Sequence, residues 1–385
     1  MLPKYRLMVP GPTPLPPAVT MAAVRPIEDE RTPEYAAVFR RILDNLKKMF
    51  RTENSVLVFT SSMTGAFEGA VQNLLSPGDH VLVAVNGVYG DRWATLCRAF
   101  GLRVTEVGAA WGEAVDMREV ARTLAEHGDI TAAIAVHCET STGVVNDIEA
   151  FGRAAADVLS VVDTASGLGA CELRTDDWGI DVVVAGGQKA LMTPPGVAFA
   201  SISENAWRHH AKATLPRFYF DWTQVRATTE SALAHTPWTP AITLLSQLDV
   251  ALGQILEEGL DNVLRRHVVL GRMARAGVRA MGLEVYGTDD DRAGSVTAVR
   301  LPRGIDVEAL IRSAFVRHGV QFVGGPGALA GHVLRIGHCG YVDAFDVLSA
   351  LGALELSLCD TGHDLVVGEG VAAALRTFHT SADAV

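Results

Sequence analysis

Short apolar, β-branched segments recur along the first half of the chain, and helix-like segments separate most of them. These segments lie at residues 56–59, 81–85, 103–107, 132–136, 158–162, 180–185 and 197–200. Strands that alternate with helices form a mostly parallel sheet with helices on both faces. Ligands of such sheets bind beyond the carboxyl ends of the strands. The pattern therefore predicts an α/β domain whose site lies at one edge of its sheet.

The pattern changes after residue 200. An aromatic-rich stretch and a proline-rich loop at 236–240 precede a long helix, expected at about 241–258, which ends at Gly259. A second set of helices and strands follows, with its last helix expected at about 343–359. We therefore predict an N-terminal arm at 1–20, a large domain at 21–258 and a smaller C-terminal α/β domain at 259–385.

The overall charge, the hydropathy pattern and the cysteine content argue against several classes of protein. The formal net charge of -11 argues against a nucleic-acid partner. No charged leader and no long apolar run is present, so we expect neither secretion nor a membrane span. The five cysteines are scattered, which indicates reduced cytoplasmic thiols and neither a disulfide framework nor a metal site.

Lys189 follows the strand expected at 180–185, after Gly186 and Gly187. Two prolines and a glycine at 194–196 prevent a helix there, so Lys189 is expected on a fixed loop. Lysine is rarely buried without a partner. One interpretation is a Schiff-base lysine whose amine is made nucleophilic by desolvation. The other is a surface lysine at a strand-to-loop junction, which is the more common case for a single lysine.

Other polar and aromatic side chains follow the expected strands at the same edge of the sheet. Hydroxyl-bearing residues at 60–64 precede a helix expected at about 66–75, which is typical of an anion site but also of an ordinary helix cap. Tyr89, Thr140 and Asp163 each follow a different strand. Because these candidates share one edge with Lys189, together they favour a binding site.

The residue types at this edge match the needs of pyridoxal phosphate. The phosphate would bind at the helix start formed by Ser62, Met63 and Thr64. The ring would lie between Tyr89 and the small Ala165.

Three further side chains complete the prediction. Asp163 would keep the pyridine nitrogen protonated, so that the ring can act as an electron sink. Lys189 would hold the aldehyde as a Schiff base and later shuttle a proton. Thr140 could hydrogen-bond the ring oxygen.

Several motifs carry a resemblance to a known family. They are Asn86–Arg92, Glu139–Gly143, Val162–Gly169, Gln188–Met192, Thr236–Ala241 and Leu334–His338. With these motifs the chain, from Pro10 to about Leu358, resembles the class V pyridoxal-phosphate aminotransferases, and specifically the bacterial alanine/serine–glyoxylate group.

The resemblance implies a fold-type I homodimer with a large domain, built on a mostly parallel seven-stranded sheet, and a small domain. It places Gln188 near the cofactor and implies that Thr236 and Thr239 reach the phosphate of the neighbouring subunit. It further implies that Arg335 holds the substrate carboxylate and that Gly11 contributes to the substrate site.

Two positions depart from the family pattern. Met63 stands where the phosphate loop of the family usually has glycine, and glycine allows close backbone approach. Gly186 and Gly187 precede the lysine where the family often has serines. Such changes can accompany a different substrate.

The leading hypothesis is transamination from a small amino acid such as alanine or serine to glyoxylate or pyruvate. A second hypothesis is elimination on the same scaffold, as in cysteine desulfurases, for which Cys138 lies beside the expected ring. A third is a cofactor-free binding or regulatory subunit, against which Asp163, Lys189 and Arg335 argue.

Overall fold

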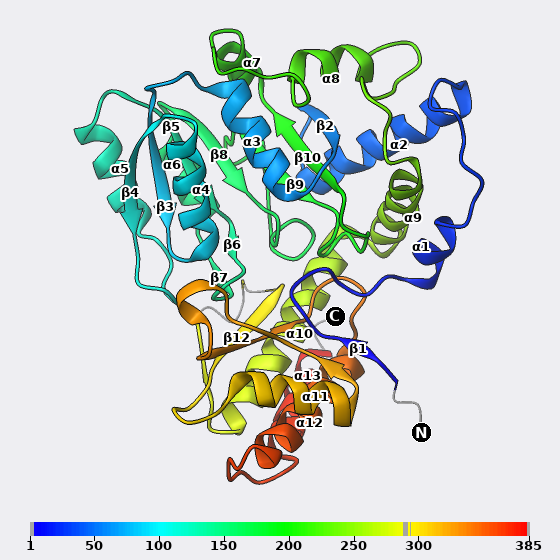
Figure 1. Cartoon of the computed structure of the whole chain (residues 1–385), viewed down its shortest axis with the longest axis vertical. Helices are drawn as coiled ribbons and strands as arrows, with labels where there is room; N and C mark the ends of the chain where they lie inside the picture. The colour runs from blue at the N-terminus through cyan, green and yellow to red at the C-terminus, as the bar shows by residue number, and fades with distance from the viewer. Residues whose placement is uncertain (1–3, 288–291, 293, 383–385) are drawn as a thin grey trace.

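A computed structural model describes residues 4–287, 292 and 294–382 (Figure 1). Its strands are β1 (Arg6–Leu7), β2 (Ser55–Thr60), β3 (His80–Val85), β4 (Arg103–Gly108), β5 (Ile130–Val136), β6 (Cys138–Glu139), β7 (Val144–Val145), β8 (Leu159–Asp163), β9 (Val182–Gly186), β10 (Val197–Ile202), β11 (Glu284–Val285), β12 (Val296–Arg300), β13 (Val320–Gln321), β14 (Val323–Gly324) and β15 (Val333–Gly337). Its α-helices are α1 (Pro17–Ala22), α2 (Pro33–Phe50), α3 (Met63–Leu74), α4 (Val88–Ala99), α5 (Met117–Glu126), α6 (Ile148–Ala154), α7 (Glu204–His210), α8 (Trp222–Thr229), α9 (Ile242–Glu258), α10 (Leu260–Ala280), α11 (Val307–His318), α12 (Ala344–Asp360) and α13 (Glu369–Ala382).

The larger sheet has seven strands in the order β2-β10-β9-β8-β5-β3-β4. All neighbours pair in parallel except β10, which runs antiparallel to both β2 and β9. Separate apolar cores fill its two faces, which explains why its central strands are apolar at nearly every position. The predicted mostly parallel, seven-stranded α/β sheet is confirmed.

The second half of the chain forms a smaller antiparallel sheet in the order β11-β12-β15-β14. Its core is shared with α10, α11, α12 and α13 (Figure 1). Helix α13 was missed in the sequence, where the helix that corresponds to α12 was expected to be the last. The domain limits at residues 20 and 258 stay a prediction.

The N-terminal segment joins the two parts of the chain. Strand β1 pairs in parallel with β13, which lies in the chain between β12 and β14 of the smaller sheet. The chain then crosses toward the larger sheet before α1 begins at Pro17 (Figure 1). The arm thus contacts both parts of the chain, and its last residues form the start of a helix.

Candidate active site at the carboxyl edge of the large sheet

Lys189 lies on a tight turn directly after β9, and the segment with two prolines forms no helix before β10. Its side chain is partly buried, and its Nζ donates a hydrogen bond to the Pro10 carbonyl oxygen at 3.0 Å. Gly11 packs so closely that a Cβ there would lie 3.2 Å from this Nζ. Burial lowers the pKa of Lys189, which favours the neutral, nucleophilic amine.

Asp163 is the last residue of β8, the strand next to β9. Its buried carboxylate accepts hydrogen bonds from Trp93 Nε1 at 3.1 Å and from the Ala165 N–H at 2.9 Å. Burial raises the pKa of Asp163 to about 6, although these hydrogen bonds oppose the shift. The contact from Trp93 was missed in the sequence, because a tryptophan on an apolar helix face is typical of a core residue.

A cavity of about 280 Å³ lies where β5, β8 and β9 end. The predicted site residues that line it are Gly11, Ser62, Met63, Thr64, Tyr89, Thr140, Asp163, Ala165, Gln188 and Lys189. The structure thus brings most of the candidate set together around one space. Thr236, Thr239 and Arg335 do not line this cavity.

The first turn of α3 faces the cavity. The helix begins at Met63, three residues earlier than expected, and Ser62 occupies the N-cap position without a side-chain cap hydrogen bond. Among the described residues no group accepts a hydrogen bond from the N–H of Met63 or Thr64. Unpaired N–H groups and the helix dipole attract anions. The N-terminus of α3 is therefore suited to bind an anion of the size of phosphate.

Tyr89 lies in the first turn of α4, whereas the residue pattern predicts that this helix begins only at Trp93. The cap comes from a distant segment: the Glu139 carboxylate accepts from the N–H groups of Tyr89 at 3.0 Å and Gly90 at 3.2 Å. Arg92, also in the wall of the cavity, lies over the Tyr89 ring at 4.9 Å.

Arg335 is a buried residue in the middle of β15. Its Nε donates to the Gly324 carbonyl oxygen at 3.0 Å and its Nη1 to the Thr140 carbonyl oxygen at 3.2 Å. Among the described residues no carboxylate forms an ion pair with it. Burial lowers the pKa of Arg335, while the Tyr89 hydroxyl and Glu139 act in the opposite direction.

The proline-rich loop at 236–240 lies outside the cavity of its own chain. Thr236 is buried, and its hydroxyl donates to the Trp238 carbonyl oxygen at 2.6 Å. Thr239 is exposed. The Trp238 ring stacks on Phe218 with 5.0 Å between ring centroids, and Phe218 is itself 72% exposed. This aromatic surface is unusual for a lone subunit.

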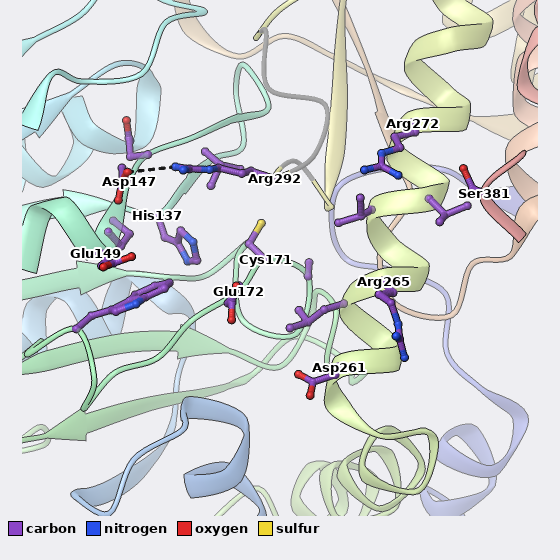
Figure 2. A pocket seen from close by; sticks show the side chains of 18 residues that line it. His137, Asp147, Glu149, Cys171, Glu172, Asp261, Arg265, Arg272, Arg292 and Ser381 are labelled. Atoms are coloured by element: carbon purple, nitrogen blue, oxygen red, sulfur yellow. Dashed lines mark ion pairs between the residues drawn. The ribbon is translucent and has the colours of Figure 1, made fainter. Parts of the chain in front are cut away.

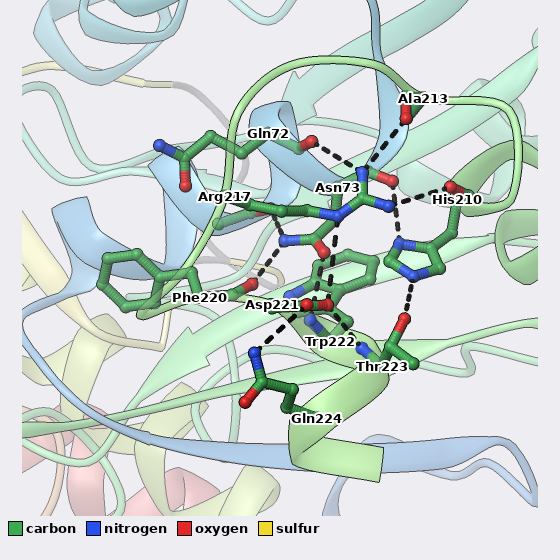
Figure 3. Close-up of polar contacts among 11 residues, drawn as sticks. Gln72, Asn73, His210, Ala213, Arg217, Phe220, Asp221, Trp222, Thr223 and Gln224 are labelled. Atoms are coloured by element: carbon green, nitrogen blue, oxygen red, sulfur yellow. Dashed lines mark hydrogen bonds and ion pairs between the residues drawn. The ribbon is translucent and has the colours of Figure 1, made fainter. Parts of the chain in front are cut away.

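Helix α3 is fixed to the segment that follows α7 by a polar network (Figure 3). Arg217 donates to the carbonyl oxygens of Gln72, His210 and Ala213 at 3.3–3.4 Å. Asn73 donates to Gly69 and Phe220, and its own side-chain oxygen accepts from the Trp222 N–H. These contacts seat the Phe220 ring against the first turns of the helix that carries the anion site.

A larger cavity of about 580 Å³ lies behind this edge and contains none of the predicted site residues (Figure 2). Its walls mix acidic and basic side chains, and Arg292 forms an ion pair with Asp147 at 3.4 Å. The thiols of Cys138 and Cys171 are both buried, and each lines one of the two cavities. No cluster of three potential metal ligands occurs among residues 4–287, 292 and 294–382.

The sequence model of the aminotransferase class-V family matches residues 21–334. The chain belongs to the class V aminotransferases. It is thus an enzyme of the transferase class, and pyridoxal phosphate is the cofactor of the family.

Relatives of this class V aminotransferase extend over nearly the whole chain. An L-aspartate–glyoxylate aminotransferase of Paracoccus denitrificans is 38% identical over 96% of this chain and 94% of its own. A protein of Synechococcus sp. named soluble hydrogenase, small subunit, is also 38% identical, and the match covers 98% of this chain and 99% of that protein. The crystal structure of pyridoxamine–pyruvate aminotransferase from Mesorhizobium loti superposes with a TM-score of 0.93 at 31% identity, covering 99% of this chain and 98% of that one.

Proposed function

We propose that this class V aminotransferase transfers the amino group of a small amino acid, such as alanine, serine or aspartate, to glyoxylate or pyruvate. The names of its relatives support these substrates. The observation that carries the proposal is the juxtaposition of Lys189 and Asp163 at the ends of adjacent strands, facing one cavity beside an open helix N-terminus.

The residues of the cavity fit pyridoxal phosphate. Ser62, Met63 and Thr64 would hold its phosphate, because their helix turn offers unpaired N–H groups and hydroxyls. Gln188 adds an amide beside this turn. Tyr89 would stack on the ring.

Further residues would hold the opposite side of the cofactor. Ala165 leaves space for the ring face, and the Thr140 hydroxyl would bind its oxygen substituent. Asp163 would pair with the ring nitrogen, and Lys189 would carry the cofactor covalently as a Schiff base.

When bound, pyridoxal phosphate supplies an electron sink for the carbanion that forms when a substrate loses its Cα proton. Side chains of the protein would transfer the proton and supply the charge that stabilises the cofactor ring. Burial lowers the pKa of Lys189, which favours the unprotonated Nζ that would take the Cα proton of the substrate. The Asp163 carboxylate, held by Trp93 and Ala165, would stabilise positive charge on the ring nitrogen.

Arg335 would bind the substrate α-carboxylate. Two of its N–H groups are fixed by main-chain carbonyl oxygens, so the orientation of the guanidinium is set in advance. A planar guanidinium suits a carboxylate better than a lysine does. Gly11, which packs on Lys189, would leave room for the substrate.

The proposal includes a cytoplasmic homodimer with shared active sites. The loop at 236–240, in which Thr239 is exposed, and the adjoining aromatic surface would lie against the second subunit, with Thr236 and Thr239 near its phosphate site. All five cysteines are free thiols, which suits a reducing compartment. No helix in the described part of the chain is long and apolar enough to cross a bilayer.

Elimination of the desulfurase type is less well supported. That chemistry needs a mobile, reactive cysteine, but Cys138 is buried and its thiol lies 3.2 Å from the Ser295 hydroxyl. The interaction with Cys171 and burial raise the pKa of Cys138, which disfavours the thiolate. Some relatives are named hydrogenase subunits, but this cavity has the lysine and aspartate that an aminotransferase requires.

The two half-reactions test the proposal. The cofactor-loaded protein is mixed with alanine, serine or aspartate without an acceptor. Loss of the visible absorption band, release of one equivalent of 2-oxo acid and return of the band with glyoxylate are expected. Repeated product release without an acceptor would instead indicate elimination, and a spectrum that no amino acid changes would refute transamination.

A further inference from the structure

Glu139 is a completely buried carboxylate that the proposed chemistry does not use. It is the last residue of β6, within the β6–β7 hairpin that follows β5. A buried charge is costly unless hydrogen bonds satisfy it. The partners of Glu139 are therefore informative about why the chain keeps a charge there.

Both carboxylate oxygens accept from N–H groups. Oε2 accepts from Tyr89 at 3.0 Å and Gly90 at 3.2 Å, and Oε1 accepts from Ser141 at 3.1 Å. The Ser141 hydroxyl donates to Oε1 at 2.5 Å and accepts from the Val88 N–H at 3.2 Å. The first turn of α4 is thus capped from a segment about fifty residues away.

The close packing of Gly87 fixes this arrangement. Gly87 is the N-cap residue of α4 and has no side chain with which to cap it. A Cβ at Gly87 would lie 2.5 Å from the Glu139 carboxyl carbon. Because the Glu139 carboxylate occupies this space, position 87 has no room for a serine or aspartate that would cap the helix with its own side chain.

The same turn also holds Arg335. The carbonyl oxygen of Thr140, the residue after Glu139, accepts from Arg335 Nη1 at 3.2 Å. The Tyr89 hydroxyl lies near enough to Arg335 to oppose the lowering of its pKa by burial. One turn therefore contacts both Tyr89, in helix α4, and the buried guanidinium of Arg335, in strand β15 of the smaller sheet.

We propose that Glu139 is a positioning residue that holds Tyr89 and Arg335 in a single arrangement, so that the cofactor ring and the substrate carboxylate are oriented together. The proposal rests on the roles given above to Tyr89 and Arg335. In this role Glu139 differs from an ordinary helix cap, because an ordinary cap would stabilise α4 and would not affect how Arg335 binds the substrate carboxylate.

Glu139→Gln is the decisive variant. Because both oxygens face N–H donors, a glutamine must turn its NH₂ group toward one of them in either orientation. Hydrogen bonds to a charged group are stronger than those to a neutral one, so the substitution should weaken the protection of the amides at the start of α4. The rate of amide hydrogen exchange at Tyr89 and Gly90 should therefore rise about tenfold or more. Hydrogen exchange is measured on the cofactor-free protein, with Glu149→Gln, an exposed carboxylate on α6, as the matched control.

A second readout uses the cofactor-loaded protein with an amino acid and its decarboxylated amine. Glu139→Gln should raise the KM of the amino acid about tenfold and change that of the amine less, because only the acid needs Arg335. If Glu139→Gln does not fold, Ser141→Ala removes the bridging hydroxyl alone and should raise exchange at Val88.

Unchanged exchange at the start of α4, or an equal loss for the acid and the amine, would overturn the proposal. The exchange experiment requires neither cofactor nor turnover. A wild-type protein without transaminase activity would therefore refute the proposed function, while the exchange result would still decide whether Glu139 holds α4.

Discussion

At the residue scale, the surroundings of Asp163 explain why the cavity favours a cofactor with a positive charge. Its oxygens accept two neutral hydrogen bonds, and burial raises its pKa to about 6. A buried anion in this state is stabilised by a cation placed beside it. The protonated ring nitrogen of pyridoxal phosphate is such a cation, so that cofactor and carboxylate favour each other's charged form.

Asp163→Asn should keep most of the cofactor and lose most of the turnover. The amide retains the shape of the side chain but cannot stabilise the positive ring nitrogen. We expect kcat to fall roughly 100-fold or more, by analogy with the loss of one preorganised electrostatic contact. Cofactor content by absorbance and kcat by steady-state kinetics check this, and near-native turnover would contradict it.

The same residue makes a prediction about pH for the cofactor-free protein. The pKa of Asp163 is raised on folding from 3.8 to about 6. The folded state therefore binds the proton more tightly, and stability from this group is lost as the pH rises from about 4 to about 6.

Relative to Asp163→Asn, the wild type should lose about 3 kcal/mol of unfolding free energy across this pH range. Denaturant unfolding of both proteins at several pH values measures this difference. A difference that does not change with pH would show that Asp163 is not desolvated in the folded protein.

At the scale of elements, the starts of α3 and α4 explain what the sequence did and did not predict. Strands were predictable because buried parallel strands are apolar and β-branched throughout. The starts of both helices were placed too late. Helix α4 is capped by Glu139, and a contact between residues so far apart leaves no local signal.

The two departures from the family pattern meet where α3 packs on β9. A Cβ at Gly186 would lie 2.6 Å from the Sδ of Met63 and 2.7 Å from the side-chain oxygen of Gln188. The methionine thus occupies the space that a side chain at 186 would fill. Neither residue alone indicates this in the sequence, because the contact depends on the sheet.

Gly186→Ser should therefore displace Met63 and cost roughly 1–3 kcal/mol by overpacking. We expect weaker pyridoxal phosphate binding, and Met63→Gly should restore part of it in the double variant. Gly187→Ala is the control, because its Cβ would lie 2.0 Å from the Thr193 hydroxyl and no change at Met63 relieves that contact. Strictly additive effects on the dissociation constant would show that the two positions are independent.

At the scale of the whole molecule, the site draws on segments from both ends of the chain. Pro10 and Gly11 contact Lys189, while Arg335 reaches Thr140 from the smaller sheet. The α/β order and the strand-end residues were predictable from sequence. The crossing of the arm and the packing of β15 behind the site were not, since they depend on long-range contacts.

The loop at 236–240 predicts complementation between two inactive variants. In a homodimer with shared sites, subunits with Lys189→Ala and subunits with Thr239→Ala can form one intact site between them. Random pairing should restore about a quarter of the wild-type activity when equal amounts are mixed. Sedimentation measures the dimer, and a fully active monomer would rule out shared sites.

The most direct test of the whole account is the location of the covalent cofactor. The loaded protein is reduced with borohydride, digested and mapped by mass spectrometry. We predict a pyridoxyl-phosphate adduct on the peptide that contains Lys189, and neither adduct nor visible band in Lys189→Ala. An adduct on any other lysine of the wild-type protein, such as Lys212, would contradict the assignment of this site.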